Sequence, residues 1–210
     1  MKKEKILTNL LSHLNIKEPL LQYELAKDTI VEFVPKNSQL MKQGQYVKWF
    51  TIIVTGEIRV WHQENDKEIT LYKIKDSETC VYSIVAIEQN YQSMVNATAL
   101  KDTIIAKIPV RFMPEWKKYP SWQEFIIRTL IDKYDALLSC IKLIAFKKID
   151  ERIMTLLKDI SNETQSSEVE ISHNDIAKEI GTTREVVSKS LKRQEQLGEV
   201  LLKFKKIKLK

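Results

Sequence analysis

The sequence has 210 residues, enough for one large or two small domains with a buried core. Hydrophobic residues make up 43% and charged residues 30%, which excludes a disordered, collagen-like or purely coiled-coil chain. No apolar run approaches the roughly twenty residues of a membrane span, so we expect no membrane partner. Cys80 and Cys140 are too few for a disulfide framework, so the expected location is the reducing cytoplasm.

The excess positive charge is confined to one end of the sequence. The whole chain carries +6, and residues 182–210 contain nine basic and three acidic side chains. The other residues are therefore balanced. This asymmetry favours a polyanionic partner, although a solvated lysine-rich tail would explain the charge equally well.

The N-terminal half combines two helical pieces with many short strands. Residues 4–27 have helical periodicity, and Pro19 separates the two pieces. Many short strands at close spacing favour a sandwich or barrel. The predicted strands are Thr29–Val34, Trp49–Val54, Glu57–His62, Glu68–Ile74 and Thr103–Ile108.

After Pro120 the pattern is helical for well over thirty residues, and the long helix predicted there has two apolar stripes. One stripe has heptad-like spacing and consists of Ile127, Leu130, Tyr134, Leu137, Ile141 and Ile144. The other consists of Trp122, Phe125, Ile126 and Leu138. We expect one stripe to pack on the helix's own barrel and the heptad stripe to form a dimer interface. Burial of both stripes within one monomer is the alternative.

The C-terminal region predicts a helix-turn-helix. A further helix is expected over Ile149–Ile160, followed by a surface loop over Ser161–Ser167. Ser172 can cap the next helix, with Asp175 as its box-like partner. The apolar face of that helix is Ile176, Ala177 and Ile180, and Gly181 supplies a left-handed turn residue.

The second helix of this unit is capped by Thr182 or Thr183 and ends at Gly198. Its inward side is Val187 and Leu191, and the strands Val200–Leu202 and Ile207–Leu209 form a candidate wing. Its outward side carries residue types that bind phosphates and base edges, although a merely soluble surface helix is the alternative. These residues are Thr183, Arg184, Glu185, Ser188, Lys189 and Lys192.

Together these elements resemble the Crp/Fnr family of bacterial transcription regulators. The stretch Leu40-Met-Lys-Gln-Gly44, followed by Ile52-Ile-Val-Thr-Gly56-Glu-Ile-Arg-Val, is similar to the family's cyclic-nucleotide-binding jelly roll. Gly181-Thr-Thr-Arg-Glu-Val-Val-Ser-Lys is similar to its recognition-helix motif. The resemblance implies DNA contacts by Arg184, Glu185, Ser188 and Lys189, with His173 facing the DNA backbone. We expect Lys192, Lys203 and His173 to contribute mainly to affinity.

The implied fold class is α+β, with three parts. Residues 1–119 form a β jelly-roll sensor domain, residues 120–147 the dimerisation helix and residues 148–210 a winged helix-turn-helix. Ser190 and Gln194 depart from the family pattern, because many relatives have apolar residues there. Leu197 is expected to compensate.

The sensor domain lacks the residues that bind cyclic AMP in the family. Val81-Tyr82-Ser83 replaces the Gly-Glu-Leu stretch, and Gln92 or Ser93 falls at the arginine position. A cyclic phosphate without an arginine loses its strongest contact. We therefore expect another small-molecule effector or none, with Tyr82, Ser83, Gln92 and Ser93 as the pocket candidates.

We expect no metal and no cofactor. An iron–sulfur switch needs about four cysteines. His13 and His62 are available to ligate a haem but are more typical of surface residues. Cys80 is either redox-active or a buried small apolar residue. The sequence contains no Ser-His-Asp set, phosphate-binding glycine loop or metal spacing, so we expect no enzyme.

The sequence therefore predicts a homodimeric transcription regulator that binds palindromic double-stranded DNA and works with RNA polymerase. A sensor or interaction module of the same fold that does not bind DNA is the alternative.

Overall fold

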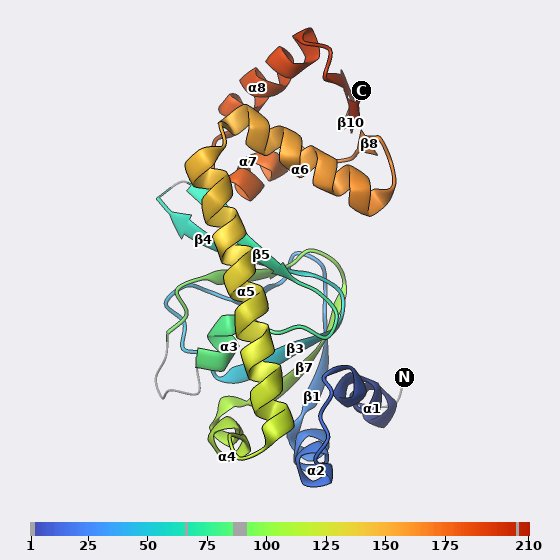
Figure 1. Ribbon diagram of the computed structural model, residues 1–210, viewed down its shortest axis with the longest axis vertical. Helices are drawn as coiled ribbons and strands as arrows, with labels where there is room; N and C mark the ends of the chain where they lie inside the picture. Colours follow the sequence, from blue (N-terminus) through green and yellow to red (C-terminus); the bar gives the residue numbers. More distant parts are fainter. Residues whose placement is uncertain (1–2, 66, 86–91, 205) are drawn as a thin grey trace. The chain divides into compact units, whose positions relative to one another are not determined.

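The computed structural model describes residues 3–65, 67–85, 92–204 and 206–210. The chain divides into two compact units, which are residues 1–62 with 71–137 and residues 63–70 with 138–210. Each unit is described by itself (Figure 1). Within the described part of the chain, every helix is too short or too polar to cross a membrane.

The two predicted N-terminal helical pieces are α1 (Lys3–His13) and α2 (Pro19–Asp28). Pro19 occupies the first position of α2, where its missing N–H removes no helical hydrogen bond. Leu10, Leu21 and Leu25 belong to a core that also contains Phe50 of the β region. The helices are thus held to the sheet by apolar burial.

Two antiparallel sheets form a jelly roll, as predicted. One has the order β1-β7-β3 and the other β2-β6-β4-β5. Side chains from both sheets, such as Ile53, Val60 and Ile105, share one core. The strands are β1 (Ile30–Val34), β2 (Gln39–Met41), β3 (Trp49–Thr55), β4 (Ile58–Glu64), β5 (Lys67–Ile74), β6 (Asn96–Ala99) and β7 (Thr103–Pro109).

The sequence did not predict β2 or β6. They have three and four residues, and β6 contains Asn and Ala, which have low strand propensity. β2 pairs with β6, and β6 also pairs with β4. These backbone hydrogen bonds hold both short segments in the strand conformation. The short helix α3 (Val81–Val85), the 3₁₀ turn η1 (Val110–Phe112) and α4 (Met113–Trp116) complete the connections.

The long helix α5 (Pro120–Phe146) packs one of its apolar stripes on the roll. Trp122 and Phe125 are buried, with the Trp122 ring centroid 5.3 Å from that of Phe50. Ile126 packs partly against the same core. This confirms the inner stripe for Trp122, Phe125 and Ile126, whereas Leu138 is only partly buried and is not among the residues of that core.

A charged residue continues that inner stripe. Lys133 is buried, its Nζ lies 2.6 Å from the Glu78 carboxylate, and it sits over the Tyr72 ring at 5.6 Å. The ion pair and the ring together replace the water that a lysine loses on burial. The sequence pattern did not predict this contact.

The heptad-like stripe lies largely in solvent. Ile127, Tyr134 and Ile141 are 57%, 65% and 59% exposed, and Leu130 and Ile144 are exposed as well. Leu137 differs, because it packs partly against the roll core of its own chain. Ile131, outside the predicted set, is also exposed.

The second unit is a winged helix-turn-helix with its own core. Ile153 and Leu157 of α6 pack there with Val169, Ile176 and others from every element. The predicted loop over Ser161–Ser167 is shorter than expected, because α6 continues to Thr164, whose hydroxyl bonds the Ile160 carbonyl. The elements are α6 (Ile149–Thr164), β8 (Glu168–Val169), α7 (His173–Ile180), α8 (Arg184–Gln196), β9 (Val200–Lys203) and β10 (Lys206–Leu209).

Two turn glycines of the roll provide a matched stability test. Both have positive φ, +81° at Gly44 and +122° at Gly56. A Cβ at Gly56 would lie 2.9 Å from the Thr103 Cα, whereas one at Gly44 would have no heavy atom within 4 Å. Gly44→Ala should cost about 1 kcal/mol of unfolding free energy through backbone strain. Gly56→Ala should cost about 1–3 kcal/mol more through overpacking. Urea denaturation measures both, and equal losses would contradict the steric interpretation.

Candidate nucleic-acid interface

Local capping fixes where the two helices of the helix-turn-helix begin. The Ser172 hydroxyl oxygen accepts the Asp175 backbone N–H at 3.1 Å and donates to the Asp175 carboxylate at 2.6 Å. Ser172 is therefore the N-cap that the sequence predicted, and the Asp175 carboxylate holds the Ser172 hydroxyl in place by accepting its hydrogen bond. Thr183 caps α8 by accepting the Val186 N–H, which decides between the two threonines.

The turn between the helices depends on Gly181. Its φ of +70° and ψ of +46° place it in the left-handed region that glycine adopts without strain. Ile176, Ala177, Val187 and Leu191 then face the shared core, as predicted. The exposed side of α8 is thereby fixed relative to α7.

One of the two polar residues on the inner side of α8 has a partner on another helix. Ser190 and Gln194 are buried, and the Ser190 hydroxyl donates to Asp150 Oδ1 of α6 at 2.5 Å. Asp150 also pairs with Arg193. The expectation that Leu197 compensates is wrong, because Leu197 is 67% exposed. A partly buried polar network connects α8 to α6 at this point, where apolar packing was expected.

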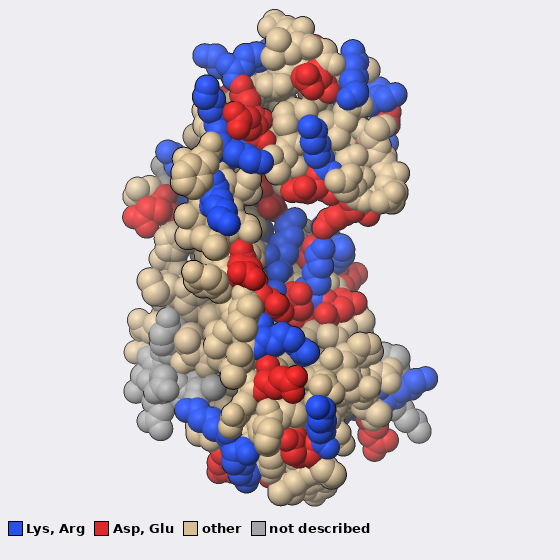
Figure 2. Space-filling model, in the orientation of Figure 1, with Lys and Arg blue, Asp and Glu red and all other residues tan. Residues whose placement is uncertain are grey.

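The outward face of α8 gathers five of the predicted DNA-binding residues. They line a shallow groove of about 460 Å³, and they are Arg184, Glu185, Ser188, Lys189 and Lys192. Three are basic and one is acidic. Hydrogen bonds from its own backbone N–H and from the Thr183 side chain lower the pKa of Glu185, so it stays ionised. Figure 2 shows Lys and Arg side chains over the C-terminal elements, with acidic ones between them.

His173 joins this face from α7. Its Nδ1 lies 2.9 Å from the Ser188 hydroxyl oxygen. Burial, together with the Arg184 charge, lowers the pKa of His173 below its ordinary value. The ring is therefore neutral at pH 7.

Lys203 lies apart, on strand β9 of the wing. Strands β8, β10 and β9 form the wing sheet, and Lys203 Nζ lies 2.5 Å from Glu168. Lys206 pairs in the same way with Glu170 at 2.7 Å. Phe204 is 89% exposed at the tip, a feature that the sequence analysis did not single out. Two of the wing lysines, Lys203 and Lys206, are thus paired with acidic residues on β8 or next to it.

The chain was compared with known proteins in three ways. No family profile and no curated protein matches its sequence. Among solved structures, one assigned to the Crp/Fnr family of transcriptional regulators, from Eubacterium rectale, superposes with a TM-score of 0.85 at 23% identity, covering 96% of this chain and 94% of that one. This chain has the Crp/Fnr fold.

Two further structures show the same likeness. The c-di-GMP responsive global regulator CLP of Xanthomonas campestris has a TM-score of 0.80 at 17% identity, over 90% of this chain and 97% of its own. A double mutant of CooA from Carboxydothermus hydrogenoformans has a TM-score of 0.68 at 22% identity, over 95% and 90%. The similarity therefore spans both units of the Crp/Fnr fold.

The four candidate effector residues do not line the cavity that strands β1, β2, β3 and β7 form in this Crp/Fnr roll. Ser83 and Ser93 are buried, and the Ser93 hydroxyl donates to the Val95 carbonyl at 2.8 Å. Tyr82 is partly buried against the roll core, whereas Gln92 is exposed. The structure therefore places two of the four against the protein interior and one in solvent.

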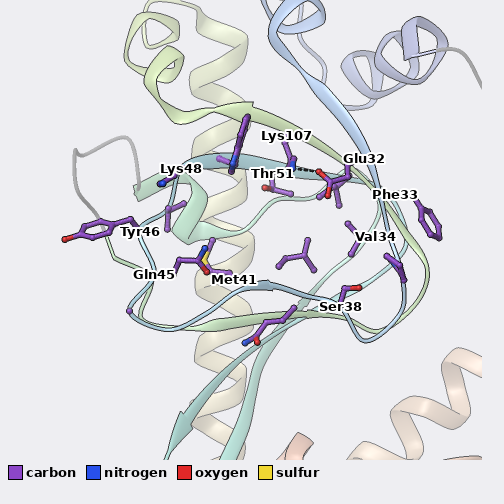
Figure 3. A pocket seen from close by; sticks show the side chains of 17 residues that line it. Glu32, Phe33, Val34, Ser38, Met41, Gln45, Tyr46, Lys48, Thr51 and Lys107 are labelled. Atoms are coloured by element: carbon purple, nitrogen blue, oxygen red, sulfur yellow. Dashed lines mark ion pairs between the residues drawn. The ribbon is translucent and has the colours of Figure 1, made fainter.

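A cavity of about 620 Å³ opens elsewhere in the roll, among strands β1, β2, β3 and β7. Figure 3 shows Lys107 paired with Glu32 in its wall, while Phe33 and Tyr46 point outward. Lys107 Nζ also lies 5.1 Å from the Trp49 ring centroid. The sequence did not predict this cavity, because it does not show that β7 lies beside β1 and β3, which are distant from it in the chain.

Cys80 lies in the core of the roll. Its Sγ is 3.5 Å from the Tyr72 hydroxyl, and burial raises the pKa of the thiol. Such an environment disfavours the reactive thiolate. The rings of His13 and His62 bond the carbonyls of Asn9 and Met94. Over the described residues, no three His, Cys, Asp or Glu side chains gather as a metal site.

The Asp150 network gives a test of how α8 is held. Asp150→Ala leaves the Ser190 hydroxyl buried without its acceptor, so the unfolding free energy should fall by about 1–3 kcal/mol. Asp159→Ala, an exposed position on the same helix, should change it by less than about 0.5 kcal/mol. Chemical denaturation of both, with Ser190→Ala and the double variant, completes a mutant cycle. Strict additivity of Asp150→Ala and Ser190→Ala would contradict the proposed coupling.

Proposed function

We propose that this protein is a sequence-specific DNA-binding transcription regulator of Crp/Fnr type. The observation that carries the proposal is the exposed face of α8, where Arg184, Glu185, Ser188, Lys189 and Lys192 line one groove. Arginine and lysine pair with guanine, glutamate accepts from the cytosine amino group, and serine bonds either. The shared fold and the charge excess of residues 182–210 support the same proposal.

Within this face we assign different roles to different residues. Glu185, Ser188 and Lys189 lie at i, i+3 and i+4, so they project together from the helix, and Arg184 adjoins them. We assign base reading to these four. Lys192, the Thr183 cap and His173 contact phosphates. The Lys203 ammonium group is already paired with Glu168. Lys203 therefore contacts a phosphate only after this ion pair breaks.

The regulator acts as a homodimer through the heptad-like stripe of α5. Five of the six predicted interface residues are exposed, a pattern expected of a stripe that a partner covers. Leu137 contributes less to this interface, since its side chain also packs on its own roll. A twofold axis would place two recognition helices on palindromic half-sites about 34 Å apart.

Regulation would act through the roll and through RNA polymerase. Cyclic AMP is not the effector, because Tyr82 and Gln92-Ser93 stand where a carboxylate and an arginine would hold it. Another small molecule, or no effector at all, is compatible with this roll.

The dimer proposal predicts the effect of charge on the stripe. Tyr134→Glu combined with Ile141→Glu would bury unpaired charges at the interface, so the variant should sediment as a monomer while retaining its helical circular dichroism. Lys142→Glu, an exposed position on the same helix but off the stripe, should leave the dimer intact. A dimeric double variant would show that the stripe is not the interface.

The division of roles predicts two different DNA-binding defects. Glu185→Ala should relax the preference at one base pair by about 1–3 kcal/mol. Lys192→Ala should weaken binding to all sequences alike and lower the salt slope by about one unit. Selection from a random duplex library, followed by titrations at several salt concentrations, measures both.

Lys158→Ala, an exposed lysine on α6, serves as the control and should match the wild type. Identical profiles for Glu185→Ala and Lys192→Ala would mean that α8 does not read bases. The absence of any salt-dependent DNA binding would favour the interaction module instead.

A further inference from the structure

One hydrogen bond links the first helix of the helix-turn-helix to the groove of α8. His173 begins α7 and Ser188 lies in the middle of α8, fifteen positions later. The His173 Nδ1 and the Ser188 Oγ are 2.9 Å apart in a partly buried contact. Ser188 is half-buried, whereas Arg184, Glu185, Lys189 and Lys192 on the same groove are exposed. Its hydroxyl therefore has a defined neighbour, which can orient it.

The direction of this bond decides what Ser188 offers to a base. If Nδ1 carries no proton, the hydroxyl donates to it, and the oxygen lone pairs face the groove. If Nδ1 carries a proton, the oxygen accepts it, and the hydroxyl hydrogen is free to point into the groove. An acceptor matches the amino groups of adenine or cytosine, and a donor matches guanine N7 and O6 or thymine O4.

The phosphate contact that we assign to His173 above selects between these two forms. Phosphate oxygens only accept, so a neutral His173 can bond the DNA backbone only by donating from Nε2. Neutral imidazole has one N–H, so a proton on Nε2 leaves Nδ1 as an acceptor. Of the two neutral forms of the ring, only this one allows both contacts.

We propose that His173 is a positioning residue that holds the Ser188 hydroxyl as a hydrogen-bond acceptor toward the DNA. The proposal rests on the DNA-binding function proposed above. His173 touches no base itself and acts through Ser188. It thus contributes to specificity as well as to affinity.

The charges around the ring allow it to be neutral. Arg184 of α8 carries the charge that acts on it and disfavours protonation. On α7 itself, the Asp175 carboxylate accepts from Ser172. From α6, Arg152 bonds the Ile180 carbonyl at the other end of α7. Burial and the Arg184 charge lower the pKa of the His173 ring below its ordinary value of 6.5. Once the pH falls below this lowered pKa, the protonated ring must donate from Nδ1 and so reverses the sense of the Ser188 bond.

The first test needs no DNA. Ring ¹⁵N chemical shifts of the full-length protein at about pH 8 report which nitrogen of His173 carries the proton. We expect the Nε2–H form, with the Nδ1 shift moving toward that of a free acceptor in Ser188→Ala. A dominant Nδ1–H form, or a spectrum that Ser188→Ala leaves unchanged, would overturn the proposal.

The second test selects binding sites from a random duplex library at about pH 8 and at a pH below the pKa of the His173 ring, which the ¹⁵N shifts followed through a pH titration supply. The base pair read by Ser188 is the one whose preference disappears in Ser188→Ala. At this pair the wild type should prefer an amino-bearing base by roughly fivefold or more at the higher pH and lose or reverse that preference at the lower pH. His173→Phe, which keeps a ring but no nitrogen, should show a weak preference at this pair that does not change with pH.

The other two histidines supply the controls. His13→Gln and His62→Gln should keep the wild-type pH effect. Failure to enrich any sequence would refute the DNA-binding function itself. Enriched sites whose preference at this pair does not change with pH, or changes equally in His173→Phe, would refute the role of His173 alone.

Discussion

The architecture depends on one helix with two apolar stripes, of which a single chain covers only one. Trp122 and Phe125, on the inner stripe of α5, are buried against the roll, and both rings contact the ring of Phe50. The outer stripe leaves Ile127, Tyr134 and Ile141 more than half exposed. Apolar area contributes roughly 25 cal/mol per Å² when it is removed from water. The same helix therefore completes the core of the roll and presents the surface that we propose for dimerisation.

Polar groups at two buried positions give these packings a defined register. Lys133 reaches Glu78 from α5, and Ser190 reaches Asp150 from α8. Each pair joins elements far apart in the sequence. Because an unpaired buried charge is costly, sliding α5 by one residue would lose the Lys133 contact as well as apolar area. These contacts thus contribute more to specificity of packing than to its strength.

The lysines of the C-terminal segment differ in whether they form ion pairs. The wing lysines Lys203 and Lys206 are matched by Glu168 and Glu170. Lys189 and Lys192 on α8 lie in an exposed groove, and none of the ion pairs among the described residues involves them. Lys203 and Lys206 of the wing therefore differ from Lys189 and Lys192 of α8, because only the wing pair already has acidic partners. The α8 surface has lysine charge available to a polyanion.

The sequence by itself determined the features that depend on neighbours along the chain. Ser172 as a cap, Gly181 as the left-handed turn and the periodicity of α5 are local properties, so they were predicted correctly. The residues on the outward face of α8 followed from the same helical spacing. The five longer strands were also found, because their β-branched and aromatic runs are themselves local signals.

Only the tertiary structure decided which residues meet across the fold. It supplied the partners that stabilise β2 and β6, the buried position of Lys133 and the exposure of Leu197. It also brought His173 to Ser188 and Lys203 to Glu168, residues fifteen and thirty-five positions apart. Such contacts depend on how helices and strands pack in three dimensions. The periodicity of one segment contains no information about which distant side chain will face it.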